Sequence, residues 1–187
     1  MVEDLSSAGG PSARDIVIFC EAARDGDIAD VRRLLDQYGR AIINGRDSIE
    51  ARALTWAAFS GHRDIVELLL DRGADINAPG TYDRSALTWA VNQGHGDIVT
   101  YLLEKGADPH LEDEYGRIAA DYAHQYGRED MAAEIETADA RRKQAEQEKT
   151  SAAALKLETE AKAAAAQDIQ RLKSLSAGKA ALKFKPK

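Results

Sequence analysis

Apolar residues in the middle of the chain follow the spacing of a helix, and the pattern returns 33 positions later. The segment Ala-Leu-Thr-Trp-Ala at 53–57 recurs at 86–90. Gly-His-x-Asp-Ile-Val at 61–66 recurs at 94–99. A fixed period of this size is typical of stacked copies of one small unit. The pattern therefore predicts a repeat protein, for which the first functional question is which partner it binds.

Each copy predicts two short helices separated by a glycine. The first helix covers 53–60 in one copy and 86–93 in the next. Gly61 and Gly94 follow it, where a residue in the left-handed conformation commonly ends a helix. A second helix, with apolar residues three and four positions apart, comes next. We expect each unit to be an antiparallel helix pair, joined to the next pair by a turn.

The second half of the unit resembles the ankyrin-repeat family, through Gly-His-x-Asp-Ile-Val-x-Leu-Leu-Leu-x-x-Gly-Ala-Asp-Ile-Asn at 61–77. The family's Thr-Pro-Leu-His-x-Ala signature is altered to Arg-Ala-Leu-Thr-Trp-Ala at 52–57 and to Ser-Ala-Leu-Thr-Trp-Ala at 85–90. Alanine is a good helix former, so the helix tolerates the loss of proline from its start. The resemblance implies an all-α solenoid of about four helix-turn-helix units.

Two weaker copies flank the clear ones. Upstream, Ala22 and Gly26 align with Ala57 and Gly61, with two extra residues around 38–42. Downstream, the last copy has fewer apolar residues, which suits a terminal unit with one solvent-facing side. We expect repeats at about 14–46, 47–79, 80–112 and 113–137, after a disordered N-terminus at 1–13.

Stacking predicts which side chains form the core, because a single helix pair cannot bury its own apolar face. We expect burial at three sets of equivalent positions. The tryptophans could instead be binding anchors, but they lie in the densest apolar part of the unit, which favours the core. The three sets are Leu54, Leu87 and Ala120; Trp56, Trp89 and Tyr122; and Ile65, Ile98 and Met131.

The family resemblance places partner contacts at the turn tips and at the exposed end of each first helix. These are positions where the two clear copies differ. Several of them are aromatic or arginine, the residue types that dominate interface hot spots. The candidate partner-binding residues are Ser48, Ile49, Phe59, Ser60, Thr81, Tyr82, Arg84, Asn92, Gln93, Glu114, Tyr115, Arg117, Gln125 and Tyr126, with Ala51 also at a tip.

Charge divides the chain into two parts. Residues 1–137 hold 13 Lys+Arg and 26 Asp+Glu, a balance of −13, and residues 138–187 hold 12 and 6, a balance of +6, which together give the net charge of −7. An acidic field favours basic segments and repels nucleic acid. We therefore expect a monomer that binds a protein partner, and the acidic balance favours a partner with a basic segment.

The segment 138–175 contains no glycine or proline and is rich in strong helix formers. It predicts a long charged helix, and no helix terminator separates this helix from the last repeat. Its leucines do not hold an a/d heptad, so a monomeric helix is favoured over a coiled coil. Ser-Ala-Gly at 176–178 then predicts the end of the helix and the start of a basic tail at 176–187.

The Lys-rich end leaves several roles open. It can bind nucleic acid through phosphates, touch an anionic membrane, fold back on the acidic repeats, or remain solvated without a partner. An adaptor for nucleic acid or membrane is the alternative to a protein-binding module. The lysines concerned are Lys173, Lys179, Lys183, Lys185 and Lys187.

Motifs for catalysis are missing from the sequence. It contains no nucleophile elbow, phosphate loop or His-Glu-x-x-His motif, and no cysteine or histidine set with metal-ligand spacing. His62 and His95 share one repeat position, which favours a structural role, and Cys20 is expected to be a buried hydrophobe. We expect no catalytic residue, metal or cofactor. With neither a signal peptide nor a membrane span, we expect a cytoplasmic protein, with the nucleus left open.

Overall fold

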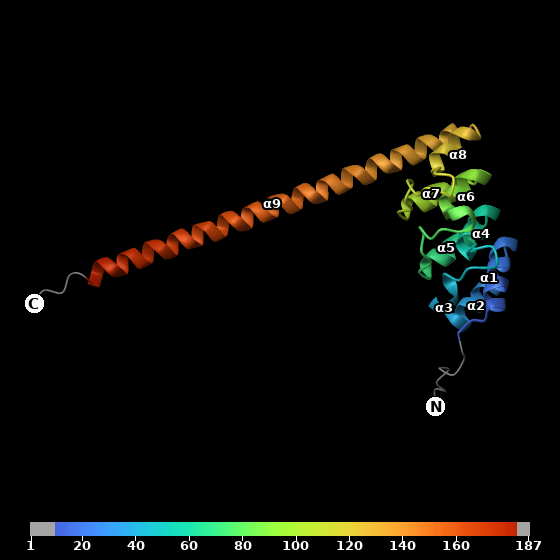
Figure 1. Cartoon of the computed structure of the whole chain (residues 1–187), viewed down its shortest axis with the longest axis horizontal. Coiled ribbons are helices and arrows are strands. Elements are labelled where there is room, and N and C mark those ends of the chain that lie inside the picture. The colour runs from blue at the N-terminus through green and yellow to red at the C-terminus, as the bar shows by residue number, and fades with distance from the viewer. Residues whose placement is uncertain (1–9, 183–187) are drawn as a thin grey trace, which may run out of the picture. The chain divides into compact units, whose positions relative to one another are not determined.

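A computed structural model describes residues 10–182, and their side chains up to residue 170 except at Ala165 and Asp168. The chain divides into two units, Met1–Asp139 and Ala140–Lys187. The described part of the chain is helical and contains no strand. The first unit holds stacked helix pairs, and the second consists of the greater part of one long helix (Figure 1).

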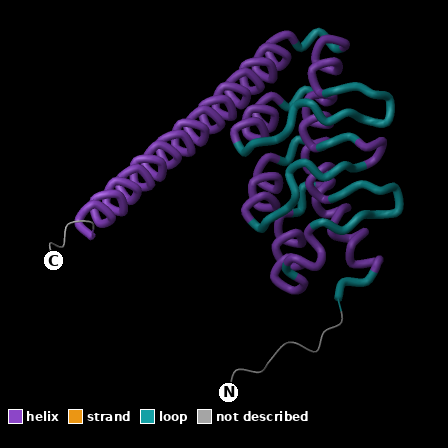
Figure 2. The backbone as a smooth tube through the Cα atoms, turned by 60° about the vertical axis from the view of Figure 1, so that its left-hand side comes forward, coloured by secondary structure: helices purple, strands orange, loops and turns teal. Residues whose placement is uncertain are grey.

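Four helix pairs build the first unit. They are α1 (Ala13–Asp25) with α2 (Ile28–Tyr38), α4 (Ala53–Ser60) with α5 (Arg63–Asp71), α6 (Ala86–Gln93) with α7 (Gly96–Glu104), and α8 (Ala119–Gln125) with the start of α9 (Glu129–Leu182). The first helices pack in the order α1, α4, α6, α8, while α2, α5 and α7 pack in a second row. The loops between pairs, teal in Figure 2, extend to one side of the stack. The predicted all-α stack of helix pairs is confirmed.

Glycines end the first helices, as the sequence indicates. Gly61 follows α4 with φ +85°, and Gly94 follows α6 with φ +86°. A Cβ on Gly61 would lie 2.6 Å from Cε1 of His95, so this glycine also allows close contact with the next pair. The bounds predicted for these two helices, 53–60 and 86–93, agree with the structure.

Equivalent side chains link each helix pair to the one before it. Nε2 of His62 donates to the carbonyl oxygen of Arg24, and Nε2 of His95 donates to that of Phe59, each at 3.0 Å. Arg128 stands at the same repeat position and donates to the carbonyl of Val91. A carbonyl can only accept, so both histidines carry the proton on Nε2. The predicted structural role of the two histidines is confirmed.

A continuous apolar core runs through the first unit. Each fully buried Leu, Ile or Val contributes about 1.5–3 kcal/mol relative to exposure. Cys20 lies in this core at 1% exposure, as expected for a small hydrophobe. The largest fully buried side chains are Phe19, Val31, Ile42, Ile65, Val66, Leu69, Leu87, Val91, Ile98, Val99, Leu102 and Tyr122.

The start of the chain and the segment after α2 add detail to the prediction. Helix α1 already begins at Ala13, inside the segment 1–13 expected to be disordered, because Ser12 caps it and forms a capping box with Asp15. Residues 1–9 of that segment lie outside the described residues. The two extra residues predicted around 38–42 form part of an additional short helix, α3 (Arg40–Ile43).

The predicted end of the long helix at residue 175 is wrong. Helix α9 continues through Ser-Ala-Gly at 176–178 to Leu182. A single glycine in a helix costs only about 1 kcal/mol relative to alanine, and its neighbours here are strong helix formers. The segment 176–182 of the predicted basic tail is therefore helical, while 183–187 lie outside the described residues.

Candidate functional site

Three equivalent loops carry the turn tips, after the first, second and third helix pairs. Each is closed by a backbone hydrogen bond of 2.9 Å, from the N–H of Asp47, Gly80 and Asp113 to the carbonyls of Ala51, Arg84 and Arg117. The side chains at the centre of the loops are large and exposed: Ile49 at 50%, Tyr82 at 50% and Tyr115 at 60%. The rings of Tyr82 and Tyr115 lie 6.5 Å apart between centroids. The tips therefore form a row of exposed apolar side chains.

Neighbouring tips are bonded to each other. The hydroxyl of Thr81 donates to the carbonyl of Ile49 at 2.8 Å, and the N–H of Glu114 donates to the carbonyl of Tyr82 at 3.1 Å. Tyr82 itself has φ +61°, a conformation that a residue with a Cβ adopts only at a cost of about 1–2 kcal/mol. The row is thus held in place by hydrogen bonds before any partner arrives.

A carboxylate organises the inside of the first and third of these loops. In the first of these loops, Asp47 accepts from the N–H groups of Ile49 and Ala51 at 2.9 Å and from the indole N–H of Trp56 at 2.8 Å. Asp113 does the same 66 positions later, with the amides of Tyr115 and Arg117 and the hydroxyl of Tyr122. The loop between them has Gly80 at this position and lacks the carboxylate.

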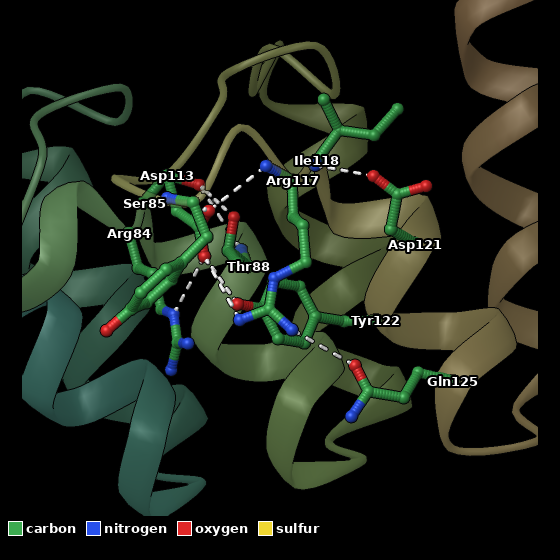
Figure 3. A network of polar contacts seen from close by, with 10 residues as sticks. Arg84, Ser85, Thr88, Asp113, Arg117, Ile118, Asp121, Tyr122 and Gln125 are labelled. Atoms are coloured by element: carbon green, nitrogen blue, oxygen red, sulfur yellow. Dashed lines mark hydrogen bonds and ion pairs between the residues drawn. The ribbon is translucent and has the colours of Figure 1, made fainter.

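Asp113 lies in a buried polar network (Figure 3). Nε of Arg84 donates to its carboxylate at 3.2 Å, and the guanidinium groups of Arg84 and Arg117 lie 4.8 and 4.4 Å from the ring centroid of Tyr122. Burial alone would raise the pKa of Asp113, but bonds from Tyr122, from the amides of Arg117 and Tyr115 and from Arg84 lower this pKa to about 2. Burial and the bond to Asp113 raise the pKa of Tyr122 to about 12. The network is therefore a structural support for the last loop.

An apolar groove opens between the tips at 47–51 and 80–84 and the helices α4 and α6. Its volume is about 240 Å³. Phe59 stands between two indoles, with its ring edge-to-face against Trp56 at 5.6 Å and against Trp89 at 5.3 Å. The groove is lined by Ile49, Ala51, Thr55, Trp56, Phe59, Thr81, Tyr82 and Trp89.

The expectation that all three aromatic positions of the first helices belong to the core is confirmed for Tyr122, whereas Trp56 is only partly buried against the core and Trp89 is only half-buried. Trp56 and Trp89 are half-buried and line the groove, whereas Tyr122 is 1% exposed. The side chains of Ala51 and Thr81 at the adjoining tips are too small to cover the indoles. A sequence signal did exist, since Phe59 was a candidate contact residue and lies one helical turn from Trp56.

The predicted partner-binding residues fall into three groups. Ile49, Phe59, Thr81 and Tyr82 line the groove, with the tip residue Ala51, and Tyr115 extends the row of tips. Arg84 and Arg117 belong to the Asp113 network, and the side chain of Arg84 is only 12% exposed. The others lie at the surface or partly buried outside the groove lining: Ser48, Ser60, Asn92, Gln93, Glu114, Gln125 and Tyr126.

Reactive groups in the described part of the chain have structural partners. Burial raises the pKa of Cys20 to about 12, so its thiol is not a nucleophile at neutral pH. His110 pairs with Asp139 at 2.7 Å and His124 with Glu129 at 3.2 Å. The described residues contain no group of three side chains arranged to hold a metal ion.

The predicted Lys-rich tail is only partly covered. Lys173 and Lys179 lie in the backbone of α9, but their side chains are not described, and Lys183, Lys185 and Lys187 lie outside the described residues. Within the described range, no helix combines the length and the apolar character needed to cross a bilayer.

Comparison with known proteins agrees with this geometry. A family model described as ankyrin repeats (many copies) matches residues 54–103. Osteoclast-stimulating factor 1 of Bos taurus is 47% identical over 49 residues, which are 26% of this chain and 22% of that protein. Ankyrin repeat domain-containing protein 49 of Homo sapiens is 44% identical over 57 residues, 30% of this chain and 23% of that protein.

A third relative is a much longer protein. The E3 ubiquitin-protein ligase XBAT32 of Arabidopsis thaliana is 39% identical over 56 residues, 30% of this chain and 11% of that protein. The match thus spans less than a quarter of each of these relatives. Ankyrin repeats are generally non-catalytic modules for protein–protein interaction. The matched family model, the repeated helix pairs and the projecting loops together show that this chain contains ankyrin repeats.

Proposed function

We propose that this chain is a non-enzymatic interaction module that binds a protein partner through its turn tips and the inner row of first helices. The observation that carries the proposal is the row of exposed Ile49, Tyr82 and Tyr115, on loops bonded to one another. Large side chains that are ordered before binding lose little conformational entropy when a partner covers them. Aromatic residues also supply much of the binding energy of protein interfaces.

The partner is expected to be basic where it meets the repeats. The balance of 13 Lys+Arg against 26 Asp+Glu in residues 1–137 gives this part of the chain a negative field. Such a field speeds the approach of a positively charged partner, and the effect weakens as salt screens it. The charge thus contributes mainly to association rate and choice of partner, while the tip side chains supply contact area.

Affinity capture from lysate of the source cells tests this proposal. The full chain and its Tyr82→Ala/Tyr115→Ala variant serve as baits, and Tyr101→Ala is the matched control because Tyr101 lies on α7, away from the tips. A protein retained by the wild type and the control but lost with the double variant supports the proposal. Equal capture by all three baits, or capture that needs only residues 140–187, would contradict it.

A further inference from the structure

We propose that the groove around Phe59 is an anchor site for one large apolar side chain of an extended, basic protein segment. This inference rests on the proposed protein-binding function and adds the place and chemistry of the contact. The groove is lined largely by apolar side chains and has a volume of about 240 Å³. An apolar cavity of about 150 Å³ already accepts benzene. The groove is thus large enough for a leucine or phenylalanine side chain.

The loop at 80–84 lacks the carboxylate that its two neighbours have. In the neighbouring loops, Asp47 accepts a hydrogen bond from the indole N–H of Trp56, and Asp113 accepts one from the hydroxyl of Tyr122. Gly80 replaces the aspartate between them, and a Cβ there would lie 2.8 Å from the hydroxyl of Thr55. The indole N–H of Trp89 therefore has no hydrogen-bond partner among the described residues. It supplies a donor for a backbone carbonyl of an extended segment.

Charge at the rim selects a basic occupant. Three arginines near the groove pair with a carboxylate, Arg24 with Asp25, Arg46 with Glu50 and Arg84 with Asp113. Arg52, next to groove residue Ala51, has no ion pair among the described residues, and two of its guanidinium nitrogens are buried. Asp83 follows groove residue Tyr82 and is exposed, with no ion pair among the described residues. Asp47, bonded to the indole of Trp56, also has no cationic partner in that range. The exposed carboxylate of Asp83 and the negative balance of residues 1–137 together favour an occupant with Lys or Arg on either side of the anchor.

A peptide selection on the full chain tests the inference. A library of random dodecapeptides is selected against residues 1–187, and enriched peptides are synthesised with a fluorophore and titrated by anisotropy. The expected sequences carry Leu, Phe or another large apolar residue flanked by Lys or Arg. Enrichment of acidic peptides, of peptides without an apolar residue, or of none would overturn the proposal.

Substitutions then locate the site. Phe59→Ala should weaken the selected peptides about tenfold or more, as expected for the centre of a contact. Trp89→Phe keeps an aromatic side chain, though a smaller one, and removes the N–H donor; it should weaken binding by at least about fivefold, the effect of one hydrogen bond. Asp83→Asn should weaken binding by about two- to fivefold at low salt, with a smaller effect at high salt.

Control variants separate site effects from loss of fold. Tyr101→Ala removes a half-buried aromatic ring of α7, and Asp71→Asn removes an exposed carboxylate at the end of α5; neither lines the groove. Both should bind as the wild type does, and circular dichroism confirms that each variant is folded. Unchanged affinity in both Phe59→Ala and Trp89→Phe would overturn the proposal. So would self-association of the chain that requires Phe59, since the occupant would then be a second copy.

Failure of the anchor site can be distinguished from failure of the proposed protein-binding function. Tyr115 belongs to the row of tips but does not line the groove. A lysate partner that is lost with Tyr115→Ala but retained by Phe59→Ala would refute the anchor site and leave the protein-binding function intact. Loss with Phe59→Ala supports both.

Discussion

The hydroxyl of Tyr122 on α8 donates a hydrogen bond to the carboxylate of Asp113, which is buried inside the last loop. The same carboxylate accepts hydrogen bonds from the amide N–H groups of Tyr115 and Arg117 and from the guanidinium of Arg84. These bonds fix the loop to the helical stack. The stability of this loop should depend on a single charge.

Replacing that charge should destabilise the protein. Asp113→Asn keeps an acceptor for the amides but leaves Arg84 without its buried counter-ion, so we expect a loss of about 2–4 kcal/mol in the free energy of unfolding. Asp47→Asn is the matched control, since Asp47 has an equivalent set of bonds but no arginine within ion-pair distance. It should cost only about 1 kcal/mol. Urea denaturation measures both, and equal losses would contradict the role given to Arg84.

The stability due to Asp113 should depend on pH in the acid range. Its pKa is lowered to about 2 in the folded protein, whereas aspartate in an unfolded chain has a pKa of about 3.9. A lowered folded-state pKa adds stability that is present above pH ~4 and lost as the pH falls towards 2. The contribution at neutral pH is on the order of 2 kcal/mol. The stability difference between wild type and Asp113→Asn should narrow across this window and stay constant between pH 5 and 7.

Two glycines with nearly the same backbone conformation should respond differently to alanine. Gly73 has φ +90° with open space where a Cβ would lie, so Gly73→Ala should cost about 1 kcal/mol for the backbone conformation alone. In Gly61→Ala the new Cβ would also displace His95 and break its bond to Phe59, for a total of about 2–3 kcal/mol. Thermal and urea unfolding check the difference. If His95→Ala does not remove the excess cost in a double-mutant cycle, another contact is responsible.

The first residues of α9, up to Asp139, should contribute to the free energy of unfolding, and the rest of the helix should not. Met131, Ala132 and Ile135 are buried, whereas every described side chain from Ala140 to Ala164 is exposed. A chain ending at Asp139 should keep the urea midpoint of the full chain while losing helical signal in circular dichroism. A chain ending at Gly127 loses the burial of Met131 and Ile135 and should be less stable by about 3–6 kcal/mol. A lower midpoint for the 1–139 chain would show that residues 140–187 contribute to stability.

The stack of helix pairs was predictable because its signals are local and repeated. The bounds of α4 and α6 follow from a glycine that takes the left-handed conformation at the same place in each copy. The roles of His62 and His95 follow from their shared position, since a ligand or catalytic group has no reason to recur with the period of the fold. The end of α9 was not predictable, because a single glycine lowers the stability of a helix by only a small free energy. Its strong helix-forming neighbours can offset that loss.

The groove was not predicted, for a different reason. Trp56 and Trp89 have the periodicity of core residues, and periodicity does not tell whether a neighbouring loop covers them. The information lay in the exchange of aspartate for glycine at position 80, which departs from the pattern at 47 and 113. Its meaning depends on contacts between loops 33 residues apart.

The bonds that join each helix pair to its predecessor have a consequence for how the number of repeats can increase. His62, His95 and Arg128 each reach back to a carbonyl at a corresponding place on the preceding first helix. The two middle units thus carry both a donor for the unit before them and an acceptor for the unit after them. A duplicated copy of residues 61–93, inserted after Gln93, would meet complementary surfaces on both sides. Such an array can lengthen by gene duplication without new compensating substitutions, and its recognition surface can diversify afterwards, one loop at a time.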